Sequence, residues 1–164
     1  MGKSSLWVHN KCFEIGILKH FKYGKGLIQG EVNGAHNLVE FSKYLNHPTY
    51  GPLIRIKSRR QVIPGVEVIE YDVRAMLSGS KWPNLRPSNP PIWKPASNPK
   101  TVYDPAIHPD RRYLMWVYQA YQDAKAKNNF YGAGSRTWDG IAKNGVKFRG
   151  HLNNIGEVTT GYIP

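Results

Sequence analysis

The stretch PLIRIKSRRQVIPGVEVIEYDVRAML, residues 52–77, decides the fold class of this chain. Within it Ile69, Tyr71 and Val73 alternate with acidic residues. A period of two is typical of a β-strand that buries one face and exposes the other. The stretch therefore predicts strands, and we expect them to pair in the antiparallel sense.

Two short helices are predicted on the N-terminal side of these strands. Between residues 13 and 21 apolar side chains recur at helical spacing, and the glycines of KYGKG, residues 22–26, end that helix. A second short helix is predicted over residues 37–46, from the spacing of Leu38 and Leu45. The glycine-rich passage GLIQGEVNGAHN, 26–37, is interpreted as a loop that brings side chains to a site.

A loop, a long helix and a hairpin are predicted on the C-terminal side of these strands. Residues 78–99 hold six prolines, so they cannot form a helix or a central strand, and Trp82 and Trp93 are expected to pack this loop. A helix is predicted to begin at Pro109, with an apolar stripe at Leu114, Val117, Tyr118 and Tyr121. The last residues, 144–164, predict a strand, an Asn-Asn turn and a strand. The fold class is therefore α+β, with short N-terminal helices, antiparallel sheets and one longer helix between strands.

Charge is the most unusual feature of the composition. The chain has 164 residues, the length of one ordinary domain, and its 23 Lys and Arg residues against 11 acidic ones give a net charge of +12. The basic residues are spread from Lys3 to Arg149, which indicates a charged folded surface and favours a polyanionic partner. Basic surfaces also serve solubility alone, and that alternative stays open.

Several other classes are disfavoured. The single cysteine, Cys12, allows no internal disulfide and no zinc site built on several cysteines. No apolar run approaches the length of a membrane span, and the N-terminus lacks the apolar centre of a signal peptide. We therefore expect no membrane insertion by this domain. No residue pattern in the chain predicts a metal or cofactor site.

The histidines are the first candidates for chemistry. Six are present, at positions 9, 20, 36, 47, 108 and 151, and His20 and His36 bracket the glycine-rich passage. An unperturbed pKa of about 6.5 allows one histidine to act as a base and another as an acid near neutral pH. Histidines also occur as ordinary surface or capping residues, so spacing alone does not assign them a role.

Four short motifs around these residues carry more information. They are KHFKYG at 19–24, NGAH at 33–36, NPKTVYDP at 98–105 and GEVTTGYIP at 156–164. Together and in this order they resemble the EndoU family of uridylate-preferring endoribonucleases, which includes a nidoviral replicase endonuclease, animal enzymes and bacterial toxins. In that family a His-x-x-Tyr/Asn-Gly motif, a histidine after glycines, a lysine before Ser or Thr, and a terminal Thr-x-Tyr follow one another.

The resemblance implies a fold, a reaction and a set of site residues. The fold would be EndoU-like, similar to RNase A, and the reaction would be metal-independent RNA cleavage by attack of the 2′-hydroxyl, leaving 2′,3′-cyclic phosphate and 5′-hydroxyl ends. His36 would be the general base, His20 the general acid, and Lys100 the cation that stabilises the charge on the phosphorane.

Substrate contacts are implied by the same resemblance. Tyr162 would stack on the ribose or base, and Thr160 or Thr101 would hydrogen-bond the base edge, which favours cleavage 3′ of uridine. Because Thr160 and Tyr162 alternate with Gly161 on a predicted strand, both side chains should point to one face. The chain departs from the family where Gly-Ala replaces Gly-Gly before His36, where Ile163 separates Tyr from Pro, and in the long proline loop before the lysine.

A second resemblance concerns the N-terminus. The motif VHNKC at 8–12 resembles the junction found upstream of toxin domains in bacterial polymorphic toxins, including contact-dependent growth inhibition systems. It divides the chain into leading residues with a toxin-junction linker, 1–12, and one EndoU-like ribonuclease domain, 13–164. It implies secretion or cell-surface delivery within a larger toxin and action in the target-cell cytoplasm. For such a toxin the net charge of +12 favours an acidic immunity protein as partner. A tRNA anticodon loop is one candidate RNA target, since RNA specificity usually falls on unpaired bases, and general RNA degradation is the alternative.

Two alternatives remain. A non-catalytic RNA- or DNA-binding module could use the same basic and aromatic surface, with salt-dependent binding and no turnover. A metal-dependent nuclease is a third option, which ranks lower because the chain contains no clustered motif such as His-Glu-x-x-His.

Overall fold

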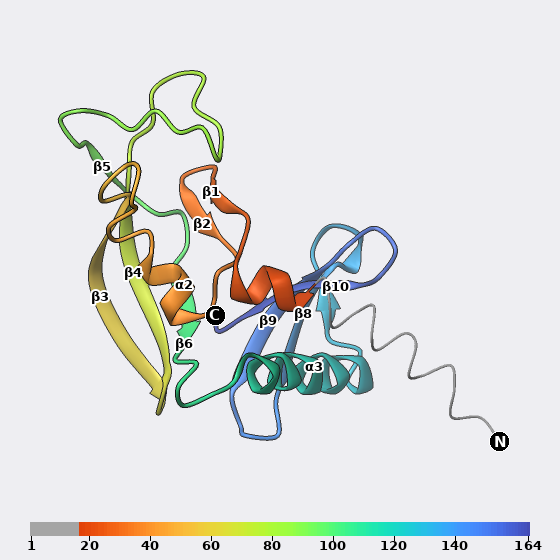
Figure 1. The fold of residues 1–164 in the computed structure, drawn as a ribbon. Coiled ribbons are helices and arrows are strands. Elements are labelled where there is room, and N and C mark those ends of the chain that lie inside the picture. Colours follow the sequence, from red (N-terminus) through yellow and green to blue (C-terminus); the bar gives the residue numbers. More distant parts are fainter. Residues whose placement is uncertain (1–16) are drawn as a thin grey trace. The chain divides into compact units, whose positions relative to one another are not determined.

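The computed structural model describes residues 17–164 as a mixed α+β structure with antiparallel sheets (Figure 1). It comprises two compact units, one spanning Lys22–His108 and the other combining the described residues up to Phe21 with Pro109–Pro164. The α+β class and the antiparallel pairing predicted from the sequence are confirmed. The junction motif at 8–12 and the predicted helix start at Phe13 lie outside the described residues.

The first unit is built on the strands predicted from residues 52–77. β3 (Ile54–Ile63) and β4 (Val66–Arg74) pair antiparallel along almost their whole length. Ile69, Tyr71 and Val73 are all buried, as the alternation predicted. Asp72 departs from the pattern, since it is also buried. Arg55 on β3 donates from Nε to its carboxylate at 2.8 Å, which compensates the cost of burial.

β4 also carries two shorter strands at its other edge. β5 (Trp93–Pro95) pairs with its last residues, and β6 (Lys100–Tyr103) pairs with its first. The proline-rich stretch is thus a loop except for the three residues of β5. The ring of Trp82 lies 5.8 Å from that of Tyr44, and the guanidinium of Arg55 lies 5.2 Å from the ring of Trp93.

The glycine-rich passage is more ordered than predicted. It forms a hairpin of two three-residue strands, β1 (Gly26–Ile28) and β2 (Glu31–Asn33). α2 (Leu38–Ser42) follows, shorter than the predicted helix at 37–46 because residues 43–46 form turns. The helix begins after Asn37, whose side-chain oxygen accepts hydrogen bonds from the backbone N–H groups of Val39 and Glu40. The hairpin and helix share one apolar core with β3, β4 and β6, which includes Leu27, Val32, Phe41, Leu53, Ile54, Ile69 and Val102.

The second unit is one helix on one sheet. α3 (Asp110–Ala126) begins after Pro109, close to the predicted start, and Leu114 and Val117 of its predicted stripe are buried. The sheet has the order β10-β9-β8-β7, formed by β7 (Phe130–Tyr131), β8 (Thr137–Ile141), β9 (Lys147–Leu152) and β10 (Val158–Tyr162). A 3₁₀ turn, η1 (Ala133–Ser135), joins β7 to β8. The predicted terminal hairpin is therefore β9 and β10.

Glycines allow α3 to lie close to this sheet. A side chain on Gly140 would overlap the carbonyl oxygen of Ala120, and one on Gly161 would overlap the side chain of Val117. The register aligns Gly161 with Gly150 and then with Trp138, so all of them share the face that α3 covers. Because successive residues alternate between faces, the neighbours of these glycines project from the opposite face.

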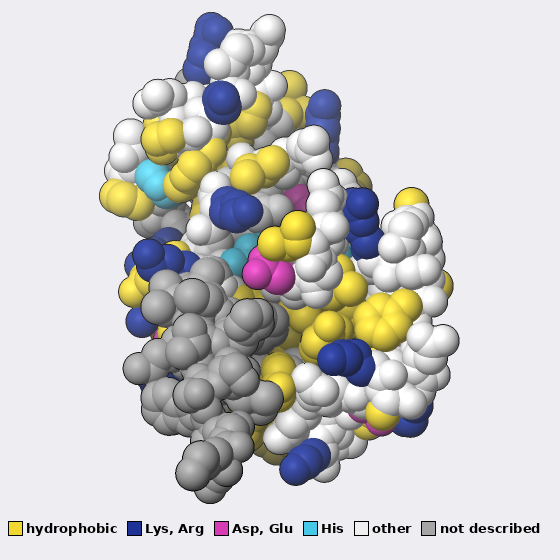
Figure 2. Space-filling view, turned by 90° about the vertical axis from the view of Figure 1, so that its right-hand side faces the viewer, with side chains coloured by type: hydrophobic (Ala, Val, Ile, Leu, Met, Phe, Trp, Pro, Cys, Tyr) yellow, Lys and Arg dark blue, Asp and Glu magenta, His cyan; other side chains and the backbone are white. Residues whose placement is uncertain are grey.

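Basic side chains are spread over the visible surface. In Figure 2 Lys and Arg side chains are scattered over the coloured part of the view, among apolar and uncharged groups and few acidic ones. Over residues 17–164, no helix is both long and apolar enough to span a membrane.

Candidate active site

His36, the predicted general base, is held in the first unit by contacts with β6. Its ring atom Nδ1 lies 2.8 Å from the carbonyl oxygen of Thr101, and the residue is only 4% exposed. A carbonyl oxygen can only accept, so Nδ1 carries the proton and donates it. The neutral ring then has its lone pair on Nε2, the nitrogen that a base in this position would use.

The backbone around His36 is also fixed. The N–H of Tyr103 donates to the carbonyl of His36 at 2.8 Å, and the next residue, Asn37, caps α2. The preceding Ala35 has a φ of 52°, in the left-handed region that glycine enters without strain. This is the position where the chain has Gly-Ala in place of the family's Gly-Gly, so Ala35 carries local strain directly before the histidine.

The motif that contains His20 contributes a glycine to the same place. Gly24 has a φ of 68°, and a side chain there would overlap the carbonyl of Asn33 and the backbone nitrogen of Ala35. The N–H of Lys25 donates to that Asn33 carbonyl at 2.8 Å. The glycine four residues after His20 therefore packs on the backbone that leads into His36.

Lys100, the predicted cation, lies at the start of β6 and is 7% exposed. Its Nζ donates to the carbonyl of Val32 on β2 at 2.8 Å. Burial lowers the pKa of Lys100 from 10.5 to about 7, and the nearby carboxylate of Glu31 opposes this shift only in part. The amine is therefore poised to gain or lose a proton near neutral pH, a property common at functional sites.

Thr101 lies beside His36 and Lys100, but its side chain is buried. The residue is 1% exposed, and its backbone carbonyl is the group that orients His36. The structure thus brings together His36, Lys100 and Thr101 from two distant segments of the chain, through the antiparallel β6 and the bridge between Asn37 and Tyr103.

Thr160 and Tyr162 lie on the second unit, on the sheet face opposite α3. Gly161 between them faces the helix, so the prediction that both side chains share one face is confirmed. In the strand register Thr160 is opposite His151, and Tyr162 is opposite Arg149. Both residues are half-buried.

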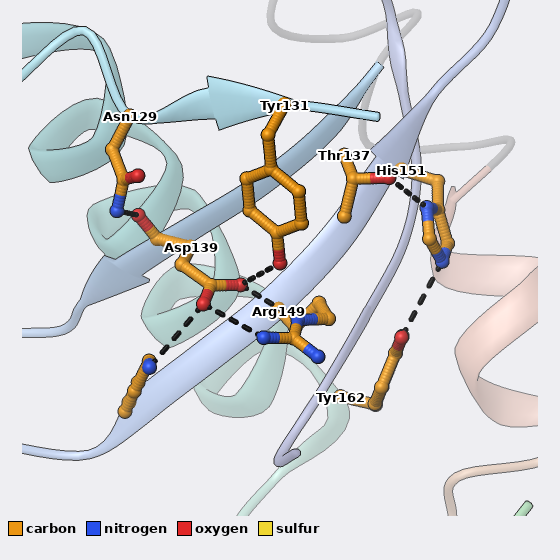
Figure 3. A network of polar contacts seen from close by, with 8 residues as sticks. Asn129, Tyr131, Thr137, Asp139, Arg149, His151 and Tyr162 are labelled. Carbon is orange, nitrogen blue, oxygen red and sulfur yellow. Dashed lines mark hydrogen bonds and ion pairs between the residues drawn. The ribbon is translucent and has the colours of Figure 1, made fainter. Parts of the chain in front are cut away.

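His151 lies on the same face, between Thr137 and Tyr162, and was not predicted as a site residue. Its Nδ1 lies 3.3 Å from the hydroxyl of Thr137, and its Nε2 lies 3.4 Å from the hydroxyl of Tyr162 (Figure 3). Burial, and secondarily the charge of Arg149, lowers the pKa of His151 below its ordinary value. The neutral imidazole is therefore favoured at neutral pH, in position to hold the ring of Tyr162.

A charged network lies beside this histidine. Arg149 donates to the carboxylate of Asp139 from Nε at 2.8 Å and from Nη2 at 2.9 Å, and the hydroxyl of Tyr131 donates to it at 2.8 Å (Figure 3). Lys147 Nζ lies 3.2 Å from the same carboxylate. Arg149 is the largest cause that holds the pKa of Asp139 far below its usual range. This network fixes Arg149 next to Tyr162.

Replacing Asp139 with Asn is expected to destabilise the protein by about 1–2 kcal/mol, because Arg149 and Lys147 lose their anion while staying partly solvated. A carboxyl whose folded pKa is lowered contributes stability above its unfolded pKa of about 4 and loses it in more acid solution. Urea unfolding at pH 7 and at pH 3 measures this. The deficit of the Asn variant should shrink at pH 3, and an equal deficit at both values would contradict the ion-pair explanation.

His20, the predicted general acid, lies on a helix at 17–22 in the described part of the chain. Its ring contacts that of Phe21 at 5.7 Å, and Phe21 packs edge-on against Tyr113 of α3 at 5.4 Å. Figures 1 and 3 show this helix beside the β10 end of the sheet. The predicted residues thus form two groups. His36, Lys100 and Thr101 belong to the first unit, and His20, Thr160 and Tyr162 belong to the second.

Comparisons with known proteins assign neither a family nor a function to this chain. No protein-family model matches the chain, and no curated protein matches it in sequence. Among residues 17–164, no group of three or more His, Cys, Asp or Glu side chains is arranged to hold a metal ion.

Proposed function

We propose that this protein is an endoribonuclease of the EndoU type, which cleaves RNA by attack of the 2′-hydroxyl on the adjacent phosphate. The observation that supports it most is the meeting of three motifs in one place. Gly24 of the first motif packs against the backbone before His36 of the second, and His36 is oriented by the carbonyl next to Lys100 of the third. The resemblance in sequence order is thereby matched by proximity in space.

The mechanism assigns one role to each group. His36 accepts the proton of the 2′-hydroxyl on Nε2, because Nδ1 already donates to Thr101. The 2′-oxygen attacks phosphorus, and the P–O5′ bond breaks as His20 donates a proton to the departing 5′-oxygen. Lys100 in its ammonium form stabilises the additional negative charge of the phosphorane. The products are a 2′,3′-cyclic phosphate and a 5′-hydroxyl.

Lys100 suits this role because its protonation responds to the substrate. In the free protein burial disfavours its charge, as the pKa of about 7 shows. A phosphate brought nearby favours the ammonium form, so the charge is stabilised most where the reaction needs it.

Substrate recognition is assigned to the open face of the second unit. Tyr162 stacks on the ribose or base and His151 holds its hydroxyl, while Thr160 hydrogen-bonds the base edge. Thr101 contributes through its carbonyl to the orientation of His36. A preference for uridine follows from the resemblance.

The proposal is tested by incubating purified protein with total RNA and with single-stranded DNA of matched sequence, both in EDTA. We expect RNA fragments with 2′,3′-cyclic phosphate and 5′-hydroxyl ends, enriched after uridine, and intact DNA, because DNA lacks the internal nucleophile. Cleaved DNA, or RNA ends with a 5′-phosphate, would contradict the mechanism. Salt-sensitive RNA binding without any cleavage would favour the non-catalytic binding module.

We further propose that the chain is the toxic domain of a polymorphic toxin, delivered by a larger protein from the cell surface and active in the cytoplasm of the target cell. The net charge of +12 favours an acidic immunity protein as its partner. A tRNA anticodon loop is the candidate RNA target, because unpaired bases are the usual targets of sequence-specific RNA recognition.

A further inference from the structure

The first unit contains a pocket away from the His36 cluster. Its volume is about 470 Å³, within the range of small-molecule sites. Its walls come from the tip of the β1–β2 hairpin, the C-terminal end of β4, β5 and the proline-rich loop, and they include Leu27, Gln29, Arg74, Met76, Trp82 and Lys94. In Figure 1 that loop arches beside the tip of the hairpin.

Trp82 is a fixed aromatic wall of this pocket. A side chain on Gly26 would overlap the indole ring, so this glycine, with a φ of 91°, lets the hairpin backbone lie directly against the ring. Tyr44 and His47 pack on the same indole, with ring centroids 5.8 and 5.9 Å away. A tryptophan held in this way offers an aromatic surface without losing side-chain freedom when a ligand binds.

The charge of the pocket is positive. Arg74 and Lys94 line it, and none of its lining residues is acidic. The guanidinium of Arg74 donates to the carbonyls of Ser88 and Tyr50, and in the described part of the chain no carboxylate pairs with Arg74 or with Lys94. Lys94 is opposite Val73 in the register, so its stem starts on the pocket side of the sheet. The pocket thus combines an aromatic wall with uncompensated cations.

We propose that this pocket binds a nucleotide unit of single-stranded RNA, with the base against Trp82, amide and hydroxyl groups such as Gln29 at the base edge, and the phosphate at Lys94 and Arg74. Stacking platforms beside cations are how proteins hold unpaired nucleotides. The same hairpin continues through Val32, the acceptor for Lys100, to His36. The pocket therefore serves as a subsite for a nucleotide flanking the scissile one, an assignment that rests on the proposed ribonuclease function.

Binding of a mononucleotide tests the pocket without any cleavage. Uridine 5′-monophosphate and uridine are titrated into the ¹⁵N-labelled protein, and the indole N–H signal of Trp82 is identified by its loss in Trp82→Phe. We expect a shift of that signal with a Kd on the order of 1 mM or below for the monophosphate, and weaker binding of uridine. No shift of the Trp82 signal with either compound would overturn the proposal.

Variants separate stacking from charge. Lys94→Gln should weaken the monophosphate about 5- to 10-fold and leave uridine unchanged, while Trp82→Leu should weaken both and Trp82→Phe should retain them. Arg60→Gln is the matched control, because Arg60 lies far along β3, opposite Val68 and away from the pocket end of β4. An equal loss in Lys94→Gln and Arg60→Gln would show a general effect of charge and contradict a defined site.

Cleavage assays connect the pocket to the reaction. With an RNA oligonucleotide, Lys94→Gln should raise KM about 5- to 10-fold and leave kcat unchanged, whereas a dinucleotide substrate should be insensitive to the variant. If the protein does not cleave RNA, the ribonuclease function fails and the monophosphate titration still decides the pocket. If it cleaves RNA and KM is unchanged in Lys94→Gln, the subsite fails alone.

Discussion

Replacing His36 with Asn should lower kcat/KM for RNA by about 100- to 10,000-fold, the usual contribution of a positioned acid or base. The side-chain amide of Asn can still donate to the carbonyl of Thr101, as the Nδ1–H of the histidine does, but it cannot accept the 2′-hydroxyl proton. The loss would therefore be a loss of basicity in a largely unchanged structure. Initial rates on a uridine-containing oligonucleotide, measured in EDTA, provide the comparison.

Two further variants make this result specific. His108→Ala removes a histidine of the same unit whose Nε2 lies 2.6 Å from the carbonyl of Pro64, and which lies outside the four motifs, so it should keep nearly full activity. His20→Ala should lose activity to a similar degree as His36→Asn, because one proton must be removed and another delivered. Retained cleavage in His36→Asn, with normal folding by circular dichroism, would refute the assignment of the base.

The main strands and the long helix could be predicted from the sequence because their periods repeat often enough to be recognised. In β4 apolar and polar residues alternate from Ile69 to Arg74, and in α3 the buried residues extend from Tyr113 to Ala124. β1, β2 and β5 have only three residues each, too few for a period to emerge. Their pairing depends on tertiary contacts, such as that of Gly26 with Trp82.

The candidate site was predictable only in part, for a related reason. The order of the motifs indicated His36 and Lys100, but the bond from His36 to the Thr101 carbonyl joins residues 65 positions apart, which no local pattern encodes. His151 was missed because one histidine on a strand has no distinguishing neighbours in sequence. The terminal hairpin places it opposite Thr160, but only through a register shift between Val158 and Thr160 that the Asn-Asn turn does not predict.

Replacing Lys100 with Met should raise stability and abolish most activity, the second large effect that we expect. Lowering the pKa of Lys100 from 10.5 to about 7 corresponds to a penalty of about 5 kcal/mol against the buried ammonium. Met has a similar length and no charge to bury. The carbonyl of Val32 loses its donor, which costs about 1–3 kcal/mol, so a net gain of about 2–4 kcal/mol at pH 7 is expected in urea unfolding. Cleavage should fall about 100- to 1,000-fold.

The stability difference between Lys100→Met and the original protein should depend on pH. Between pH 7 and pH 10.5 the unfolded chain binds a proton at Lys100 that the folded protein releases, so the stability of the original protein rises with pH through that range. The advantage of the Met variant should therefore be largest at pH 7 and below and should shrink toward pH 10. Comparing the two proteins at the same pH cancels the other titrating groups. A constant advantage would show that Met packs better and that the charge of Lys100 carries no cost.

Measurements of stability and activity together distinguish a structural from a catalytic role of Lys100. A lysine that only tethers β6 to β2 through Val32 would make Lys100→Met less stable at pH 7 and would leave the chemistry of a folded variant intact. A lysine that serves the reaction is held in a place where its charge is unfavourable until a phosphate arrives. Its removal should therefore stabilise the protein and abolish RNA cleavage. Opposite changes in the two measurements would identify Lys100 as a catalytic residue, because no purely structural role produces both.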